Sequence, residues 1–183
     1  MDGVDWGQVA LFVAIIVPSV ILHEVAHGAV ALRLGDDTAK RAGRLTLNPL
    51  AHVDPFGTVL LPILLAASGL GVIGYAKPVP VNLRRLRRPR DHAVLVALAG
   101  PATNLAIAVV AAIVVRLGGG VDGVELGDGR LGDVDLIDVA FLAGFFNVLL
   151  ALFNLIPLPP LDGSAVIERA LPRRWWPAWA KLR

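Results

Sequence analysis

Two histidines and a glutamate lie inside the first apolar stretch of the chain, in the order His23-Glu24-x-x-His27. Between residues 9 and 34 the only other charged side chain is Arg33. A run of this length and composition is typical of a helix that crosses a hydrocarbon core about 30 Å thick. Residues i and i+4 lie on one face of a helix, so both imidazoles can reach the same ion. Because ionisable groups are costly at membrane depth, these three side chains indicate a functional site.

The spacing is the H-E-x-x-H arrangement, in which two histidines bind zinc and the glutamate is the general base of a metalloprotease. We therefore expect His23 and His27 to be metal ligands and Glu24 to be catalytic. The alternative is that both histidines are packed core residues, because a match of three residues can arise by chance. A catalytic zinc usually takes three protein ligands, so the hypothesis requires a third one.

Composition limits the class of protein. The 183 residues are 56% hydrophobic and 17% charged, which is too apolar for an ordinary soluble domain and predicts a polytopic membrane protein. The length allows one compact domain, residues 1–183, with no room for a separate globular module. The chain has no cysteine, which excludes disulfides, thiolate ligands and a cysteine nucleophile. A cleaved signal peptide is not expected, because cleavage after the first apolar run would remove the histidines.

Three apolar runs predict membrane spans at about 8–34, 93–117 and 136–156. A fourth apolar segment, residues 56–75, is interrupted by four glycines and one proline. The expected fold class is therefore membrane all-α, a polytopic helical bundle with a three-span core and a re-entrant segment at 56–75. The basic and aromatic tail, residues 164–183, is expected to lie at the membrane interface as an amphipathic piece.

Charge predicts the orientation of the spans. Five arginines lie between residues 84 and 90, and a basic run beside membrane spans indicates a cytoplasmic loop near anionic lipid rather than a nucleic-acid site. Loop 118–135 is acidic and is expected outside. The predicted protein is an integral protein of a bacterial cell membrane, with its N-terminus outside and its C-terminal tail cytoplasmic.

For His23 and His27 to share an ion with Asp162, a candidate third ligand, the first helix should also run inward, which places loop 35–55 in the cytoplasm. Both ends of segment 56–75 are then cytoplasmic, so this segment re-enters. The alternative of four full spans reverses the first helix and moves His27 away from Asp162, which is poor geometry for a shared ion. Irregular backbone at membrane depth is tolerated where protein covers it.

Four more polar residues are candidates for the site. Asp162 is the remaining carboxylate at membrane depth, although Asp-Gly after Pro-Pro is also an ordinary turn signal. His52 and Asp54 lie in a turn-rich loop, where a histidine beside proline is more often structural. Asn104 lies inside the second predicted span, where it is either functional or bonded to another helix.

Three blocks together resemble the site-2 protease family of intramembrane zinc metalloproteases, in its compact bacterial branch without PDZ or CBS domains. They are His23 to His27, Gly100-Pro101-Ala102-Thr103-Asn104, and the stretch from Asn154 to Gly163. The last block matches every fixed position of the pattern N-x-x-P-x-P-x-L-D-G. Related compact members continue into another hydrophobic helix beyond the position of Arg183, so the chain is expected to be truncated or naturally short.

The resemblance implies one zinc ion per chain, held by His23, His27 and Asp162, with Glu24 as general base. It implies that Asn104 helps to bind substrate. It also implies short membrane-associated strands at 42–47 and 74–82, which would pair with an extended substrate.

The expected function is hydrolysis of peptide bonds in single-span membrane proteins, within the lipid bilayer, as in regulated intramembrane proteolysis. The alternative is a membrane protein that binds metal without hydrolysis, such as a carrier or a pseudoprotease. A carrier more often shows repeated halves, which the sequence lacks, and a pseudoprotease usually loses the glutamate or a ligand. The sequence identifies neither the substrate nor the oligomeric state.

Overall fold

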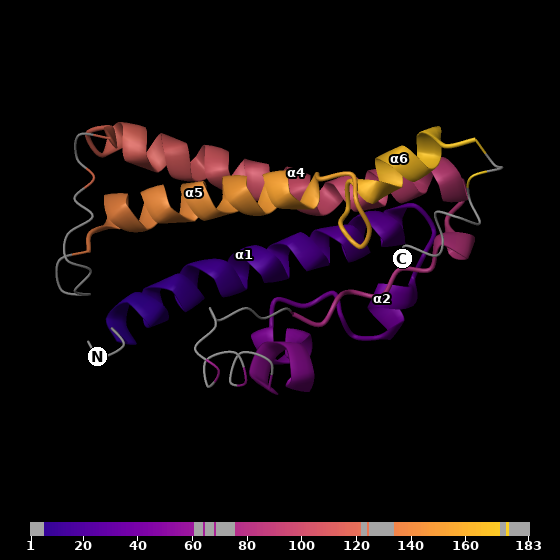
Figure 1. Ribbon diagram of the computed structural model, residues 1–183, viewed down its shortest axis with the longest axis horizontal. Helices are drawn as coiled ribbons and strands as arrows, with labels where there is room; N and C mark the ends of the chain where they lie inside the picture. The colour runs from indigo at the N-terminus through magenta and orange to yellow at the C-terminus, as the bar shows by residue number, and fades with distance from the viewer. Residues whose placement is uncertain are drawn as a thin grey trace.

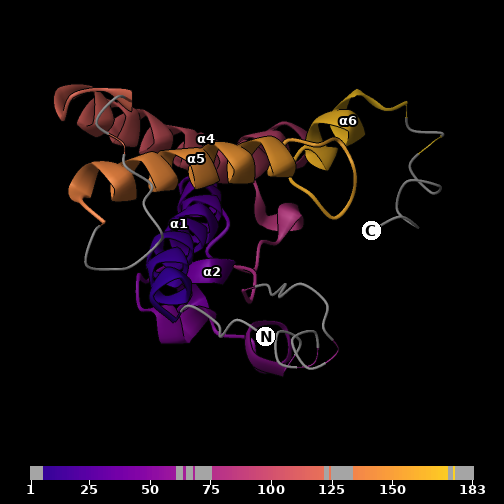
Figure 2. The same cartoon turned by 60° about the vertical axis from the view of Figure 1, so that its left-hand side comes forward.

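Three long helices form the body of the protein. The computed structural model describes residues 6–60, 64, 68, 76–121, 124, 134–172 and 175. The long helices are α1 (Trp6–Arg33), α4 (Pro89–Leu117) and α5 (Leu136–Asn154). Helices α1 and α5 run in the same direction and α4 runs against both (Figure 1). Helix α4 packs against both of the others, and the arrangement is also visible in the turned view (Figure 2).

The three helices are long and apolar enough to cross a membrane. In their most apolar 18-residue windows only 22% to 33% of residues are buried inside the protein, so most of these side chains face outward. Exposed apolar surface of this extent is stable in lipid and unfavourable in water. The predicted spans at 8–34, 93–117 and 136–156 are therefore confirmed as helices, with ends shifted by up to four residues. The chain is an integral membrane protein of mostly helical fold.

Local chemistry explains where α4 and α5 begin. Helix α5 has a capping box, in which the side chain of Asp135 accepts the backbone N–H of Asp138 and the side chain of Asp138 accepts that of Asp135. Helix α4 begins with Pro89, whose missing N–H costs nothing in the first turn. These signals place the start of α5 next to the acidic loop and the start of α4 next to the arginine run.

The shorter elements connect the long helices. They are α2 (Thr38–Arg41), the 3-10 helices η1 (Pro49–His52) and η3 (Leu83–Arg85), the π-helix η2 (Pro55–Leu60) and α6 (Ser164–Ala170). Among the described residues there is no strand, so the strands expected at 42–47 and 74–82 are not confirmed. Most of the segment 56–75 and most of the tail after residue 172 lie outside the described residues. Re-entry of the first and the interfacial position of the second stay predictions.

A buried carboxylate joins the end of α1 to the segment that precedes α4. Asp36 is fully buried, and its oxygens accept hydrogen bonds from the N–H and hydroxyl of Thr38 and from the N–H of Asn82. Burial alone would raise the pKa of Asp36, but these hydrogen bonds and the nearby Arg85 outweigh it and hold the pKa below its usual value. The ionised form is therefore the one that fixes this connection.

A second set of contacts positions the extended segment 76–82. The guanidinium of Arg44 donates to the carbonyl of Lys77 at 2.5 Å, and the N–H of Lys77 donates to the carbonyl of His52 at 2.9 Å. The side chain of His52 in turn bonds the carbonyl of Thr46 at 2.9 Å. These links fix the segment that passes over α1 beside Glu24.

Candidate metal centre

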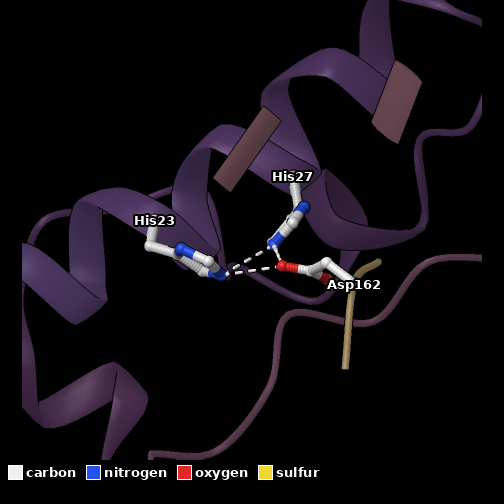
Figure 3. Close-up of side chains that lie close together, drawn as sticks. All are labelled: His23, His27 and Asp162. Atoms are coloured by element: carbon white, nitrogen blue, oxygen red, sulfur yellow. Dashed lines mark hydrogen bonds and ion pairs between the residues drawn. The ribbon is translucent and has the colours of Figure 1, made fainter. Parts of the chain in front are cut away.

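His23, His27 and Asp162 meet at one point between the helices (Figure 3). The Nε2 atoms of the two histidines are 3.0 Å apart. The Oδ2 atom of Asp162 lies 3.2 Å from Nε2 of His23 and 3.3 Å from Nε2 of His27. Because α1 and α5 run in the same direction, the residues after α5 reach the half of α1 that carries the histidines (Figure 1).

The hydrogen bonds of the other ring nitrogens define the tautomer of each histidine. Nδ1 of His27 lies 2.7 Å from the carbonyl oxygen of Val96, which can only accept, so this Nδ1 carries the proton. Nδ1 of His23 lies 2.5 Å from Oδ1 of Asn104 and donates to it in the same way. In the neutral rings both Nε2 atoms are then acceptors, and their lone pairs point toward Asp162.

This donor set fits a cation. Two imidazole nitrogens and one carboxylate oxygen converge without a proton between them in the neutral tautomers, and Oδ2 of Asp162 is a buried atom without a hydrogen-bond donor. Three acceptors this close repel one another unless a positive charge lies among them. Two histidines and one carboxylate with a position left for water are a usual ligand set of catalytic zinc.

A tight loop returns Asp162 to the end of α5. The N–H of Gly163 donates to the carbonyl of Asn154 at 2.7 Å and so closes the loop of residues 155–162. A Cβ on Gly163 would collide with the carbonyl oxygen of Leu155. The glycine of the Asn154–Gly163 block is therefore required by the close approach of two backbone segments, and this approach aims Asp162 at the histidines.

Gly100 has a role that the sequence block did not specify. A Cβ at this position would overlap the imidazole rings of both His23 and His27. Only a residue without a side chain lets α4 pass this close to the histidines. The signal was present in the Gly100–Asn104 block, but the spacing alone did not indicate what the glycine contacts.

Glu24 lies beside the cluster. Its Oε2 accepts the N–H of Val79 at 2.8 Å. Val79 stands between two prolines, so it has the only N–H in this stretch of three residues. A cavity of about 290 Å³ is lined by the three clustered residues together with Glu24 and Asn154. The predicted catalytic carboxylate and the predicted ligands therefore face one space.

Asn104 is fully buried and bonded at both ends of its amide. Its Oδ1 accepts from His23, and its Nδ2 donates to Oδ1 of Asn147 at 2.7 Å. The predicted role in substrate binding is not tested by this geometry, which instead gives Asn104 direct contact with His23, a predicted metal ligand. Asn147 was missed by reasoning from the sequence. The available signal was an amide in the middle of the apolar run of α5.

The two loop candidates are not part of the cluster. Among the described residues, the only group of three or more metal-binding side chains is His23, His27 and Asp162. His52 bonds the carbonyl of Thr46, as described above. Asp54 accepts the backbone N–H groups of Phe56 and Gly57, as a residue that starts a helical turn does.

Comparison with known proteins agrees with the cluster. The sequence model of Peptidase family M50 matches residues 11–125 and 116–175. The chain is 43% identical over 157 residues to "Putative zinc metalloprotease YwhC" of Bacillus subtilis, a match that covers 86% of this chain and 67% of the relative. It is 34% identical over 151 residues to "Putative zinc metalloprotease Rip2" of Mycolicibacterium smegmatis, covering 82% of this chain and 53% of the relative.

The protein of the same name from Mycobacterium tuberculosis is 36% identical over 151 residues. The chain spans about half the length of these mycobacterial relatives. No solved structure matches it. Since the family model covers most of its length, the chain belongs to Peptidase family M50, the site-2 protease family that its sequence resembles.

Proposed function

We propose that the chain is an intramembrane zinc metalloprotease, an endopeptidase that hydrolyses peptide bonds of membrane-spanning proteins. The observation that carries the proposal is the convergence of two imidazole nitrogens and the Asp162 carboxylate on one point, with Glu24 on the same cavity. Membership of Peptidase family M50 and the printed names of the relatives support zinc-dependent proteolysis. One ion per chain matches the single cluster of the described residues.

Zinc at this cluster would polarise a peptide carbonyl and lower the pKa of a water toward about 7. The Glu24 carboxylate would accept a proton from the attacking water and deliver it to the nitrogen of the leaving amine. The N–H of Val79 orients this carboxylate without neutralising it. The apolar side chains of Val79, Val96 and Ala97 line the cavity and limit the access of bulk water.

The proposed setting is a single domain within a bacterial cell membrane, acting on single-span substrates in regulated intramembrane proteolysis. We place the N-terminus outside and the arginine run and tail in the cytoplasm, because basic loops favour the cytoplasmic side. The cluster then lies toward the cytoplasmic half of the bilayer, at the ends of α1 and α5.

The zinc content of the purified protein tests the site. We expect about one zinc per chain in detergent-purified wild type and a much lower content in Asp162→Ala, because two protein ligands bind zinc far more weakly than three. The matched control is Asp54→Asn, which changes a loop carboxylate outside the cluster and should retain zinc. Full zinc in folded Asp162→Ala would remove this residue from the site, and loss of zinc in Asp54→Asn would implicate the loop.

The role of Glu24 is tested separately from metal binding. Glu24→Gln should keep its zinc, because Glu24 is not in the cluster, and should lose cleavage of a single-span reporter substrate, because an amide cannot accept the proton. Cleavage at the wild-type rate by zinc-loaded Glu24→Gln would contradict the assignment. A folded, zinc-loaded wild type that cleaves no membrane-spanning reporter would favour the alternative, a metal-binding protein without hydrolysis.

A further inference from the structure

An amide in the middle of α5 is fully buried and fully hydrogen bonded. Asn147 donates from Nδ2 to the carbonyl of Ala143 at 2.8 Å and to Oγ of Ser19 at 2.9 Å. Its Oδ1 accepts from Nδ2 of Asn104. One side chain of α5 thus reaches both α1 and α4 at a depth where a buried amide is costly unless all its groups are paired.

Two acceptors fix which way the amide of Asn147 points. The carbonyl of Ala143 can only accept, so the atom that faces it is the nitrogen. The hydroxyl of Ser19 donates its proton to the carbonyl of Ile15 at 2.7 Å, so its oxygen also accepts from Asn147. Because the nitrogen of Asn147 donates to both of these acceptors, its oxygen must face Asn104.

The orientation of the Asn147 amide determines that of the Asn104 amide. Because Asn147 presents an oxygen, Asn104 must present its nitrogen to it and its own oxygen to Nδ1 of His23. An oxygen at this place accepts the ring proton on Nδ1 and leaves Nε2 free. If Asn104 turned over, its nitrogen would face Nδ1 and the ring proton would move to Nε2, which faces the metal position.

We propose that Asn147 is a positioning residue that, through Asn104, holds His23 in the tautomer that binds the metal. It touches neither the cluster nor the cavity. His27 needs no such relay, because a backbone carbonyl, that of Val96, accepts directly from its Nδ1. The two histidines of one motif are therefore oriented by different means, and only His23 depends on Asn147. The inference rests on the proposed function only in taking the ligand at this position to be zinc.

The test is the tautomer of His23 in the metal-free protein. Nitrogen-15 chemical shifts of labelled histidine distinguish a protonated from an unprotonated ring nitrogen, and the His23 signals are those missing from His23→Ala. In the wild type we expect the proton on Nδ1 of both His23 and His27. A His23 ring with an unprotonated Nδ1 and a protonated Nε2 in the wild type would overturn the proposal without any variant.

Substitution of Asn147 supplies the second readout. In Asn147→Leu we expect a mixture of His23 tautomers, unchanged His27 signals, and a zinc affinity lower by about 10- to 100-fold in competition with a chelator, as for other partners of metal ligands. Asn147→Asp keeps an oxygen toward Asn104 and should restore both the Nδ1 tautomer and most of the affinity. Phe146→Leu is the packing control, because its ring contacts Phe12 of α1 next to this network without a polar link to it.

The outcomes separate this proposal from the proposed function. If Asn147→Leu changes neither zinc binding nor the tautomer of His23, the positioning role is overturned and the metal site is left intact. A wild type that binds no zinc, with the expected tautomers and their loss in Asn147→Leu, would uphold the relay and refute the zinc site. Equal losses in Phe146→Leu and Asn147→Leu, with no recovery in Asn147→Asp, would assign the effect to helix packing and overturn the proposal.

Discussion

At the scale of single residues, contacts over a short sequence distance could be predicted and contacts over a long one could not. His23, Glu24 and His27 were found because helix geometry places i and i+4 side by side. The roles of Gly100 and Asn147 depend on where α4 and α5 pass α1, which no local pattern specifies. Asn147 contacts residues 43 and 128 positions away in the chain. Asp162 was recognised by resemblance, because its Asp-Gly dipeptide alone is equally typical of a turn.

Gly100→Ala should weaken zinc binding without changing any ligand. The new methyl group would overlap both imidazole rings. Such overpacking costs about 1–3 kcal/mol, and the rings or α4 would move apart to relieve it. We expect a loss of zinc affinity of about tenfold or more, which corresponds to at least about 1.4 kcal/mol. Competition with a chelator of known affinity measures it.

Gly144→Ala is the matched control for this substitution. A Cβ on Gly144 would also be crowded by α4, at 3.2 Å from the Cβ of Ala111, but it does not contact the cluster. It should cost packing energy at the interface of α4 and α5 while zinc affinity stays near the wild-type value. Equal affinities of the two glycine variants would mean that contact with the rings is not what requires Gly100.

At the scale of elements, the long helices could be predicted and the segments between them could not. Apolar runs bounded by polar loops gave the three spans, because the length of a span is set by the bilayer. Segments 42–47 and 76–82 are held by side chains such as Arg44 and Asp36 rather than by strand pairing among the described residues. The resemblance implied strands in these segments, but the hydrogen bonds that fix them come from residues distant in the sequence.

Asp36 should make the stability of the protein depend on pH at acid pH. Its pKa is lowered in the folded state, so its contribution is fully present above the unfolded pKa of about 4 and is lost as the pH falls through the folded pKa. Asp36→Asn should reduce the free energy of unfolding by about 1–2 kcal/mol at neutral pH, because hydrogen bonds to a charged group are replaced by neutral ones. Thermal unfolding in detergent, from pH 7 downward, measures the difference.

The gap between wild type and Asp36→Asn should narrow as the pH falls below the unfolded pKa. Asp37→Asn is the matched control, since it removes the same charge from the adjacent, less buried carboxylate that pairs with Arg41 and Arg85. Its effect should be smaller, because surface ion pairs contribute little. A gap for Asp36→Asn that stays constant across the pH range would show that ionisation of this carboxylate does not stabilise the connection.

At the scale of the whole molecule, the cluster of His23, His27 and Asp162 relates the direction of α1 to that of α5, and loop charge predicts which ends face the cytoplasm. The structure shows α1 and α5 running in the same direction, as the shared cluster of His27 and Asp162 requires, and α4 running against them (Figure 1). The direction of α1 relative to α5 was predicted from the shared ligands, and the opposite directions of α4 and α5 were predicted from the charge of their loops. Which end faces the cytoplasm is predicted from the arginine run and the acidic loop, because basic loops favour the cytoplasmic side during insertion.

Labelling of introduced cysteines tests the relative arrangement of the helices separately from their orientation in the membrane. The chain has no cysteine of its own, so Lys40→Cys, Arg84→Cys and Val121→Cys each add a single thiol at an exposed position. With an impermeant maleimide on intact cells, Val121→Cys should react, whereas the other two should react only after the membrane is opened. The physical reason is that basic loops favour the cytoplasmic side, which would leave the acidic loop outside.

The pattern of labelling distinguishes a reversed orientation from a wrong arrangement of the helices. Lys40 and Arg84 belong to segments joined at the end of α1 by Asp36, so their thiols must lie on one side of the membrane in any orientation of this fold. If all three positions react in the opposite sense, the orientation is reversed and the fold stands, with the cluster moved to the outer half of the bilayer. If Lys40→Cys and Arg84→Cys react from different sides, the segment between them crosses the membrane. The described arrangement of α1 against α4 would then be wrong.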